Sequence, residues 1–364
     1  MGKNPLGMRR ILLAMTFLAL PLLAAAPAAA APPPIKHVFV IVLENKGFDT
    51  TFGPNSQAPY LSQTLPSQGE LLTQYYGIGH NSLDNYIAMV SGQAPAITTQ
   101  ADCPFYMNLF PGIIGQNDQA IGQGCVYPAT VKTVADQLSA AGLSWRGYME
   151  DMASNCERPA LNSFDQTQNA TAASQYAARH NPFVYFHSLI DSGACAANDV
   201  PLTQLDSDLS SASSTPNLAF ITPDLCHDAH DATCADGGPG GLPAADSFLQ
   251  TWVPKITGSP AWSEGSLLIV TFDEADTSDA SSCCGETPGP NSPNPGGTTQ
   301  GNGGGRTGTV LLSQYVQPGS TNATPYNHYS LLRSIEDVFG LSHLGFAAKS
   351  DLQAFGPDVY NAAG

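Results

Sequence analysis

The chain has 364 residues, of which 12% are charged, and its formal net charge at pH 7 is −17. This length allows one large α/β domain with a substantial core, or two smaller domains. A chain this acidic will not bind nucleic acid non-specifically, so a phosphate-containing ligand would need a local device such as a metal ion, a histidine cluster or a helix N-terminus.

The first 31 residues have the organisation of a secretory signal peptide. Cationic residues near the start precede an apolar run from 11 to 23, and Ala29–Ala31 offers a small-residue cleavage site. We therefore expect a secreted protein that is cleaved near Ala31, with residues 32–364 as a single domain. An uncleaved N-terminal anchor is the alternative. No later run is long and apolar enough to cross a bilayer, so no stable membrane anchor is expected.

The next segment is the apolar run Val38–Leu43, which predicts a strand buried on both faces inside a parallel sheet. Glu44 and Asn45 follow it directly. Because ligands of open α/β sheets collect at the carboxyl ends of the strands, this pair is expected to bring two oxygen ligands to the functional edge. The alternative is a strand end that simply meets water.

Further strands and helices follow along the chain, and the order of helix then strand predicts a doubly wound α/β fold, with a mostly parallel sheet sandwiched by helices. Gly, Pro, Ser and Asn dominate residues 277–308, which predicts a flexible loop and not a second domain. The expected strands are 71–76, 143–148, 218–222, 266–271 and 309–315, and the expected helices are 82–91, 130–141, 244–257 and 329–339.

The eight cysteines suggest disulfides, because an even count is typical of exported chains. The vicinal Cys283 and Cys284 either pair with each other or stay free. The plausible local pairs are Cys103–Cys125, Cys156–Cys195 and Cys226–Cys234.

Four of the predicted strands end in segments that carry acids or histidines. Such strand ends gather along one edge of a parallel sheet. Several carboxylates packed together repel one another unless a cation lies among them, so we expect one divalent metal ion with oxygen ligands. Solvated acidic loops are the alternative. The segments are Glu44–Asn45, Glu150–Asp151, Asp224–Asp231 and Asp273–Glu274.

Ser82 is the candidate nucleophile. It lies at the expected start of a helix, where unpaired N–H groups and the helix dipole favour an anion such as a phosphoryl group. A nearby metal would lower the pKa of its hydroxyl. Asn85, within one turn, is placed to donate to the phosphoryl group. The alternative for Ser82 is a plain helix N-cap.

Four histidines lie beside these segments and are candidates for metal binding, phosphate contact or protonation of a leaving group. The other four histidines, including His180, have weaker claims. The candidates are His80, His227, His230 and His328.

Long segments of the chain resemble a known family. They include HVFVIVLENKGFDTTFG at 37–53, GHNSLDNYIAMVSGQ at 79–93, LAFITPDLCHDAHD at 218–231 and LLIVTFDEAD at 267–276. The chain is similar to the bacterial phosphoesterase family of secreted acid phosphatases and phospholipases C, which are distant relatives of alkaline phosphatases. The resemblance implies an alkaline phosphatase-like fold.

The resemblance also implies roles for residues. Ser82 falls at the position of the superfamily's nucleophile, and departures occur at Asp84, where many members have proline, and at Glu274, where the zinc relatives have histidine. The second departure favours a single hard ion, with Ca, Mg, Zn and Fe all open. The expected metal ligands are Glu44, Asn45, Ser82, Asp224, Asp273 and Glu274. The expected catalytic residues are Ser82, His80, Asn85, His227, His230 and His328. The expected substrate contacts are Asn85, His80, His328 and Asp228.

The hypothesis is therefore a secreted, metal-dependent acid phosphatase that acts on phosphomonoesters, including phosphoinositides, through a phosphoserine intermediate. One alternative is a phospholipase C-type phosphodiesterase. Another is a secreted protein that binds phosphate ligands without turnover. Nothing in the sequence indicates the oligomeric state.

Overall fold

The computed structural model describes residues 1–2, 31–284, 286–294, 296 and 302–362. The predicted signal peptide lies almost entirely outside these residues, as does part of the predicted flexible loop. Residues Ala31–Gly364 group into one compact unit. Within the described residues, no helix has both the length and the apolar character that crossing a membrane requires.

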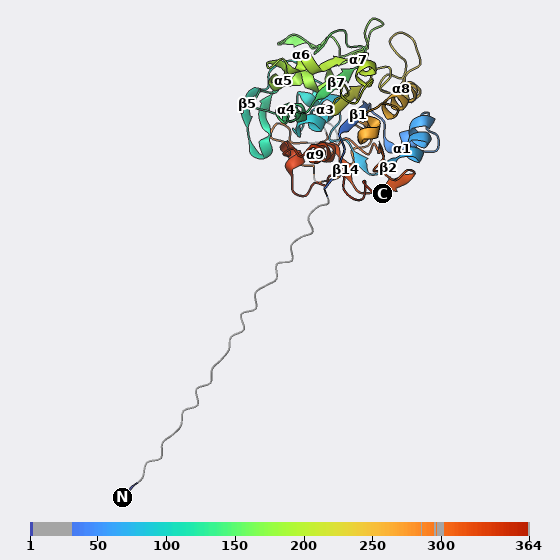
Figure 1. The fold of residues 1–364 in the computed structure, drawn as a ribbon. Helices are drawn as coiled ribbons and strands as arrows, with labels where there is room; N and C mark the ends of the chain where they lie inside the picture. The colour runs from blue at the N-terminus through green and yellow to red at the C-terminus, as the bar shows by residue number, and fades with distance from the viewer. Residues whose placement is uncertain (3–30, 285, 295, 297–301, 363–364) are drawn as a thin grey trace. The chain divides into compact units, whose positions relative to one another are not determined.

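A sheet of eight strands organises this unit, in the order β13-β2-β12-β11-β1-β10-β7-β9 (Figure 1). The neighbours β11, β1, β10, β7 and β9 run parallel, whereas β12 is antiparallel to β11 and to β2. The fold is therefore the predicted mostly parallel α/β arrangement. The bounds are β1 His37–Leu43, β2 Glu70–Leu72, β7 Trp145–Met149, β9 Asp199–Pro201, β10 Leu218–Thr222, β11 Ser266–Phe272, β12 Thr309–Ser313 and β13 Ser320–Asn322.

Helices cover both faces of the sheet, and a hydrophobic core lies on each face. Alternate residues of β1 enter different cores: Val38, Val40 and Val42 face one, and Phe39, Ile41 and Leu43 face the other. The first core includes side chains of α3, α4 and α9, and the second includes those of α7 and α8. The helix bounds are α1 Phe48–Phe52, α2 Leu65–Gln68, α3 Ser82–Ser91, α4 Val134–Ala140, α5 His187–Ile190, α6 Ala194–Asn198, α7 Gln204–Asp208, α8 Gly241–Thr257 and α9 His328–Phe339.

Two predicted elements differ in detail. The strand expected over 71–76 is divided into β2 and the separate β3 Tyr75–Tyr76, which pairs with β14 Tyr326–Asn327. The helix expected from residue 130 begins only at Val134, because Thr133 is an N-cap whose side chain accepts from the Asp136 N–H in a capping box. By contrast, α3 ends as predicted, with Gly92 in the left-handed conformation at φ 65°.

The long segment between α3 and α4 contains strands that the sequence did not indicate. The hairpin of β5 Phe110–Ile114 and β6 Ala120–Gln123 is antiparallel, and β4 Phe105–Tyr106 pairs with β8 Ser163–Phe164. These strands are short, and among the four only β6 alternates buried and exposed residues over more than two positions, so no extended periodic pattern marks them.

All three predicted cysteine pairs form disulfides, and the vicinal pair, which the sequence left open, is also bonded. Described parts of the 277–308 loop are tied to the domain. Asp279 accepts from the Arg306 N–H at 3.0 Å, and the Asn291 side chain accepts from the Gly122 N–H at 2.7 Å.

Candidate active site

Three segments meet where β1, β10 and β11 end. The Glu44 N–H donates to the Asp228 carbonyl at 2.7 Å, and the Asp273 N–H donates to the Leu43 carbonyl at 2.9 Å. The Asn45 N–H donates to Asp273 Oδ1 at 3.0 Å. The parallel register of β1 with β10 and β11 thus places carboxylates from three separate segments at one edge of the sheet.

Glu44 lies at the centre of this edge and is fully buried. Ser82 Oγ donates to its Oε2 at 2.7 Å, and the Tyr86 hydroxyl donates to its Oε1 at 2.6 Å. Burial raises the pKa of Glu44 well above its ordinary value, and the charges of Asp273 and Asp228 add to this effect. The predicted nucleophile and the predicted metal anchor are therefore in direct contact.

His180 completes the cluster, although the sequence favoured four other histidines as site residues. Its ring stacks on Tyr86 with centroids 5.4 Å apart. Its Nδ1 lies 3.1 Å from Asp228 Oδ2, and its Nε2 lies 3.4 Å from Glu44 Oε2 without hydrogen-bond geometry. One ligand atom from each of Glu44, His180 and Asp228 lies within 4.8 Å of the others, so these side chains form a candidate metal-binding group.

Asp273 supplies a test of whether a cation fits. Its Oδ1 accepts from the N–H groups of Asn45 and Glu274, but its Oδ2 is buried and has no hydrogen-bond partner among the described residues. Burial raises the pKa of Asp273 to about 6. An orphaned carboxylate oxygen beside Glu44 and Asp228 suits a divalent cation, because a buried anion is costly unless it is paired. We call Glu44, His180, Asp228 and Asp273 the serine group.

Glu274 follows Asp273 and is held by its neighbours. Its Oε1 accepts from the Asn81 N–H at 3.0 Å, and its Oε2 lies 2.5 Å from His80 Nδ1. The other ring nitrogen of His80 lies 3.0 Å from the Asp279 carbonyl. Both nitrogens of His80 are thus engaged within the protein.

Asn85 and His328 are engaged in the same way. The Asn85 side chain accepts from the Ile78 N–H at 2.8 Å and donates to the Gly79 carbonyl at 2.8 Å, which fixes the turn before Ser82. His328 Nε2 lies 2.5 Å from the Asp273 carbonyl, and its Nδ1 lies 3.0 Å from the Tyr75 hydroxyl. The phosphate contacts predicted for these residues stay predictions, and the geometry adds a positioning role.

The start of α3 differs from the expectation. Asp102 Oδ1 accepts from the Leu83 N–H at 3.0 Å, so a carboxylate of the protein occupies a donor that was expected to face a phosphoryl group. Asp102 lies 3.9 Å from buried Arg179. Sequence reasoning could not find this contact, because Asp102 follows the helix by more than ten residues in an irregular segment.

Asp224 and His227 form a second group with Glu150, which we call the outer group. His227 Nδ1 lies 3.1 Å from Glu150 Oε2 and 3.2 Å from Asp224 Oδ1. Hydrogen bonds to these two carboxylates raise the pKa of His227 to about 10. The outer group therefore carries its own cation, and Asp224 is not in the candidate metal-binding group that contains Glu44.

His230 lies between the serine group and the surface. Its ring centroid is 5.9 Å from that of His180, and its Nδ1 lies 2.8 Å from Asp231 Oδ1. Its Nε2 lies 3.4 Å from an Arg179 nitrogen. The side chain is one-third exposed, which leaves it accessible beside the buried cluster.

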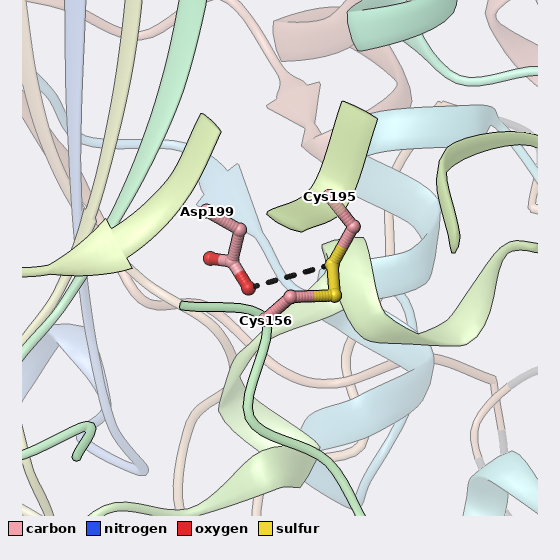
Figure 2. A group of neighbouring side chains, drawn as sticks. All are labelled: Cys156, Cys195 and Asp199. Carbon is pink, nitrogen blue, oxygen red and sulfur yellow. Dashed lines mark hydrogen bonds between the residues drawn. A yellow bond between two sulfur atoms is a disulfide. The ribbon is translucent and has the colours of Figure 1, made fainter. Parts of the chain in front are cut away.

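Two other groups of side chains have the spacing of metal ligands, but their cysteines form disulfides. Figure 2 shows buried Asp199 directed at Cys195 Sγ, which is bonded to Cys156. Cys226, beside Asp224 and His227, is bonded to Cys234. Sulfur in a disulfide is not a thiolate, so neither set matches a thiolate metal site.

Comparison with known proteins finds acid phosphatases among the relatives of this chain. A probable acid phosphatase of Kluyveromyces lactis is 25% identical over 85% of this chain and 59% of its own length. A phosphate-repressible acid phosphatase of Penicillium chrysogenum is 28% identical over 84% of this chain and 59% of its own length. The chain thus spans little more than half the length of these fungal relatives. A phosphatidylinositol-3-phosphatase of Mycobacterium tuberculosis is 25% identical over 89% of this chain and 83% of its own length.

Among solved structures, a protein of the alkaline phosphatase superfamily from Vibrio parahaemolyticus matches with a TM-score of 0.51. The match covers 88% of this chain and 70% of that one at 13% identity, so it shows an alkaline phosphatase-like fold. The sequence model of the Phosphoesterase family matches residues 54–342, which include Ser82, Asp228 and Asp273 but not Glu44. The chain belongs to the phosphoesterase family.

Proposed function

We propose that this chain is a secreted, metal-dependent acid phosphatase that hydrolyses phosphomonoesters, phosphoinositides included, through a phosphoserine intermediate. The observation that supports this most is the 2.7 Å hydrogen bond from Ser82 Oγ to buried Glu44, within a group of carboxylates that contains no basic side chain other than His180. The names of the acid phosphatases and of the phosphatidylinositol-3-phosphatase among its relatives support the substrate class. The disulfides are consistent with secretion.

The serine group would hold the metal. Glu44, Asp228 and Asp273 offer oxygens and His180 offers Nε2, a donor set that suits several divalent ions. A bound divalent ion would offset the repulsion among these carboxylates and lower the pKa of the Ser82 hydroxyl. The predicted ligands Asn45 and Glu274 remain part of the proposal, since both adjoin Asp273.

The residues of the chain supply the remaining steps. Glu44 accepts the Ser82 hydrogen bond, so it fixes the direction of the attacking oxygen. Asn85 and His80 hold the backbone turn from which α3 begins. The accessible His230 is placed to protonate the leaving oxygen or to contact the phosphoryl group, and His227 is the second candidate for these roles.

An activity panel tests this proposal. Phosphomonoesters, phosphodiesters and phosphoinositides are assayed from pH 4 to pH 9, with and without a chelator. We expect phosphomonoester turnover with an acidic optimum, loss of activity with chelator, and recovery on addition of one divalent metal. The Ser82→Ala variant should lose at least about a thousandfold in kcat, since removal of a catalytic nucleophile costs at least this much. Near-normal turnover of p-nitrophenyl phosphate by Ser82→Ala would contradict the nucleophile assignment.

A phospholipase C-type phosphodiesterase is the second candidate. The observation in its favour is the apolar surface of the β5–β6 hairpin, where Phe110 is 78% exposed and Ile113 is 60% exposed. Faster turnover of phosphatidylcholine than of phosphomonoesters would select this candidate. Binding of phosphate without turnover of any ester would select the non-catalytic alternative.

A further inference from the structure

We propose that a cavity beside Lys46 binds a second phosphate on the leaving-group side of the substrate, so that the preferred substrates are polyol phosphates that carry two phosphate groups. The inference rests on the proposed phosphatase function and names the substrate class of that site.

The cavity is lined by residues that continue two segments of the serine group. Its volume is about 640 Å³, and its wall includes Lys46 and Ala232. Lys46 follows the Glu44–Asn45 pair in the chain, and Ala232 follows the segment of Asp228. The hydrogen bond from the Glu44 N–H to the Asp228 carbonyl joins these two segments where they leave the sheet. A leaving group attached to a phosphoryl group at Ser82 would then extend along these two segments toward the cavity.

Lys46 gives the cavity a cation without an acidic partner. Its Nζ donates to the Asn45 carbonyl at 3.3 Å, and among the described residues no carboxylate lies within ion-pair distance of it. Other lysines behave differently: Lys36 pairs with Glu264, and Lys255 pairs with Asp206. In a chain of net charge −17, an ammonium without an acidic partner among the described residues is available for an anionic ligand.

The acid of the cavity wall does not cancel this charge. Asp49 is the acidic residue among the described residues that line the cavity, and it pairs with Arg306 at 2.9 Å. Its side chain is 90% exposed, and the Arg306 guanidinium offsets its charge. The net charge that the cavity presents to a ligand is therefore positive at Lys46.

Three polar, uncharged side chains line part of the remaining wall, beside Ala, Gly, Pro and Leu residues. Thr50, Asn55 and Gln57 are exposed, and none of these side chains makes a hydrogen bond to another described residue. Hydroxyl and amide groups can both donate and accept, so they suit the hydroxyl groups of a sugar or an inositol ring. A polyol with a second phosphate matches these three polar side chains and the cation of Lys46.

Kinetics with matched substrates tests this inference. Wild type, Lys46→Gln and Lys46→Arg are assayed on inositol 3-phosphate, inositol 1,3-bisphosphate and p-nitrophenyl phosphate. We expect wild type to prefer the bisphosphate over the monophosphate by about tenfold or more in kcat/KM, since a charge-assisted hydrogen bond is worth at least this factor. Lys46→Gln should abolish most of the preference through KM, and Lys46→Arg should retain it. Lys36→Gln is the matched control and should keep the wild-type preference.

Equal losses on all three substrates in Lys46→Gln would overturn the inference, and so would an unchanged preference. A second measurement separates this inference from the proposed function. Calorimetry records the binding of inositol 1,3-bisphosphate to Ser82→Ala protein, with and without Lys46→Gln. Weaker binding in the double variant supports the cavity assignment even where no turnover is found, and equal affinities overturn it.

Discussion

The serine group and the outer group lie at the same edge of one sheet, but they balance their charges differently. In the outer group, His227 sits between Glu150 and Asp224, and these carboxylates raise its pKa to about 10, so the group contains a cation. In the serine group, burial lowers the pKa of His180 well below its ordinary value and raises that of Glu44. The outer group therefore balances its own charges, whereas the serine group, which has the same residue types, favours binding of an added cation.

Burial explains this difference. His227 is 40% exposed at its side chain, whereas the side chain of His180 is 2% exposed. A solvated imidazolium between two carboxylates is stable, but the same charge in a closed pocket loses its hydration. His180 is not easily protonated in this pocket, so a divalent ion would supply the two positive charges instead. Acidic residues at strand ends therefore indicate a metal most strongly where they are buried.

Among the changes that test the contrast between the two groups, Glu44→Gln has the largest expected effect. The change removes the carboxylate that accepts from both Ser82 and Tyr86, while nearly preserving side-chain volume. We expect a loss of more than about hundredfold in kcat/KM and in metal affinity, since even indirect changes near a metal cost 10–100-fold. Metal content by mass spectrometry and circular dichroism provide the readouts. An unfolded variant would indicate that the strand end is structural, and unchanged metal content would contradict the metal assignment.

A smaller effect is expected for His180→Gln. The variant loses the ring nitrogen that lies 3.4 Å from Glu44 and the ring that stacks on Tyr86, but it keeps the carboxylates of the serine group. Metal affinity should fall by about 10–100-fold, and excess metal should restore most of kcat. Activity is measured across a metal titration. Wild-type metal dependence in this variant would remove His180 from the metal site.

His180 also marks where sequence reasoning reached its limit. The strand from Val38 to Leu43 was predictable because six consecutive apolar residues need two buried faces, and Glu44 followed from the topology of parallel sheets. His180 instead ends a one-turn 3-10 helix in an irregular segment, where no periodicity assigns a direction to the side chain. Its place depends on a long-range contact with Asp228. The contact of the Tyr86 hydroxyl with Glu44 was likewise not predictable from spacing.

The outer group gives the matched contrast to Glu44. Glu150→Gln removes one of the two carboxylates around His227, in a cluster that does not need a metal. We expect unchanged metal stoichiometry, a change in kcat/KM of less than about tenfold, and a slightly lower thermal midpoint, since half-exposed ion pairs contribute little. Metal analysis and thermal unfolding are the measurements. If Glu150→Gln lost metal as Glu44→Gln should, the two groups would be a single site.

The smallest effect concerns Asp199, a buried carboxyl beside the Cys156–Cys195 disulfide (Figure 2). Asn181 donates to its Oδ2 at 2.8 Å, and burial raises its pKa to about 7. Because the folded state holds this proton more tightly than the unfolded chain, the stability it contributes is fully present below the unfolded pKa of about 4 and is lost as pH rises through the folded value of about 7. Asp199→Asn cannot ionise, so its thermal midpoint should fall less than that of wild type between pH 5 and pH 8, by roughly 2–5 °C.

Asp206→Asn, at an exposed ion pair with Lys255, is the control and should follow the wild-type curve. An identical pH dependence in Asp199→Asn and wild type would mean that Asp199 is ionised in the folded protein. In that case, burial alone would not distinguish the carboxylates of the serine group from other buried acids of this protein.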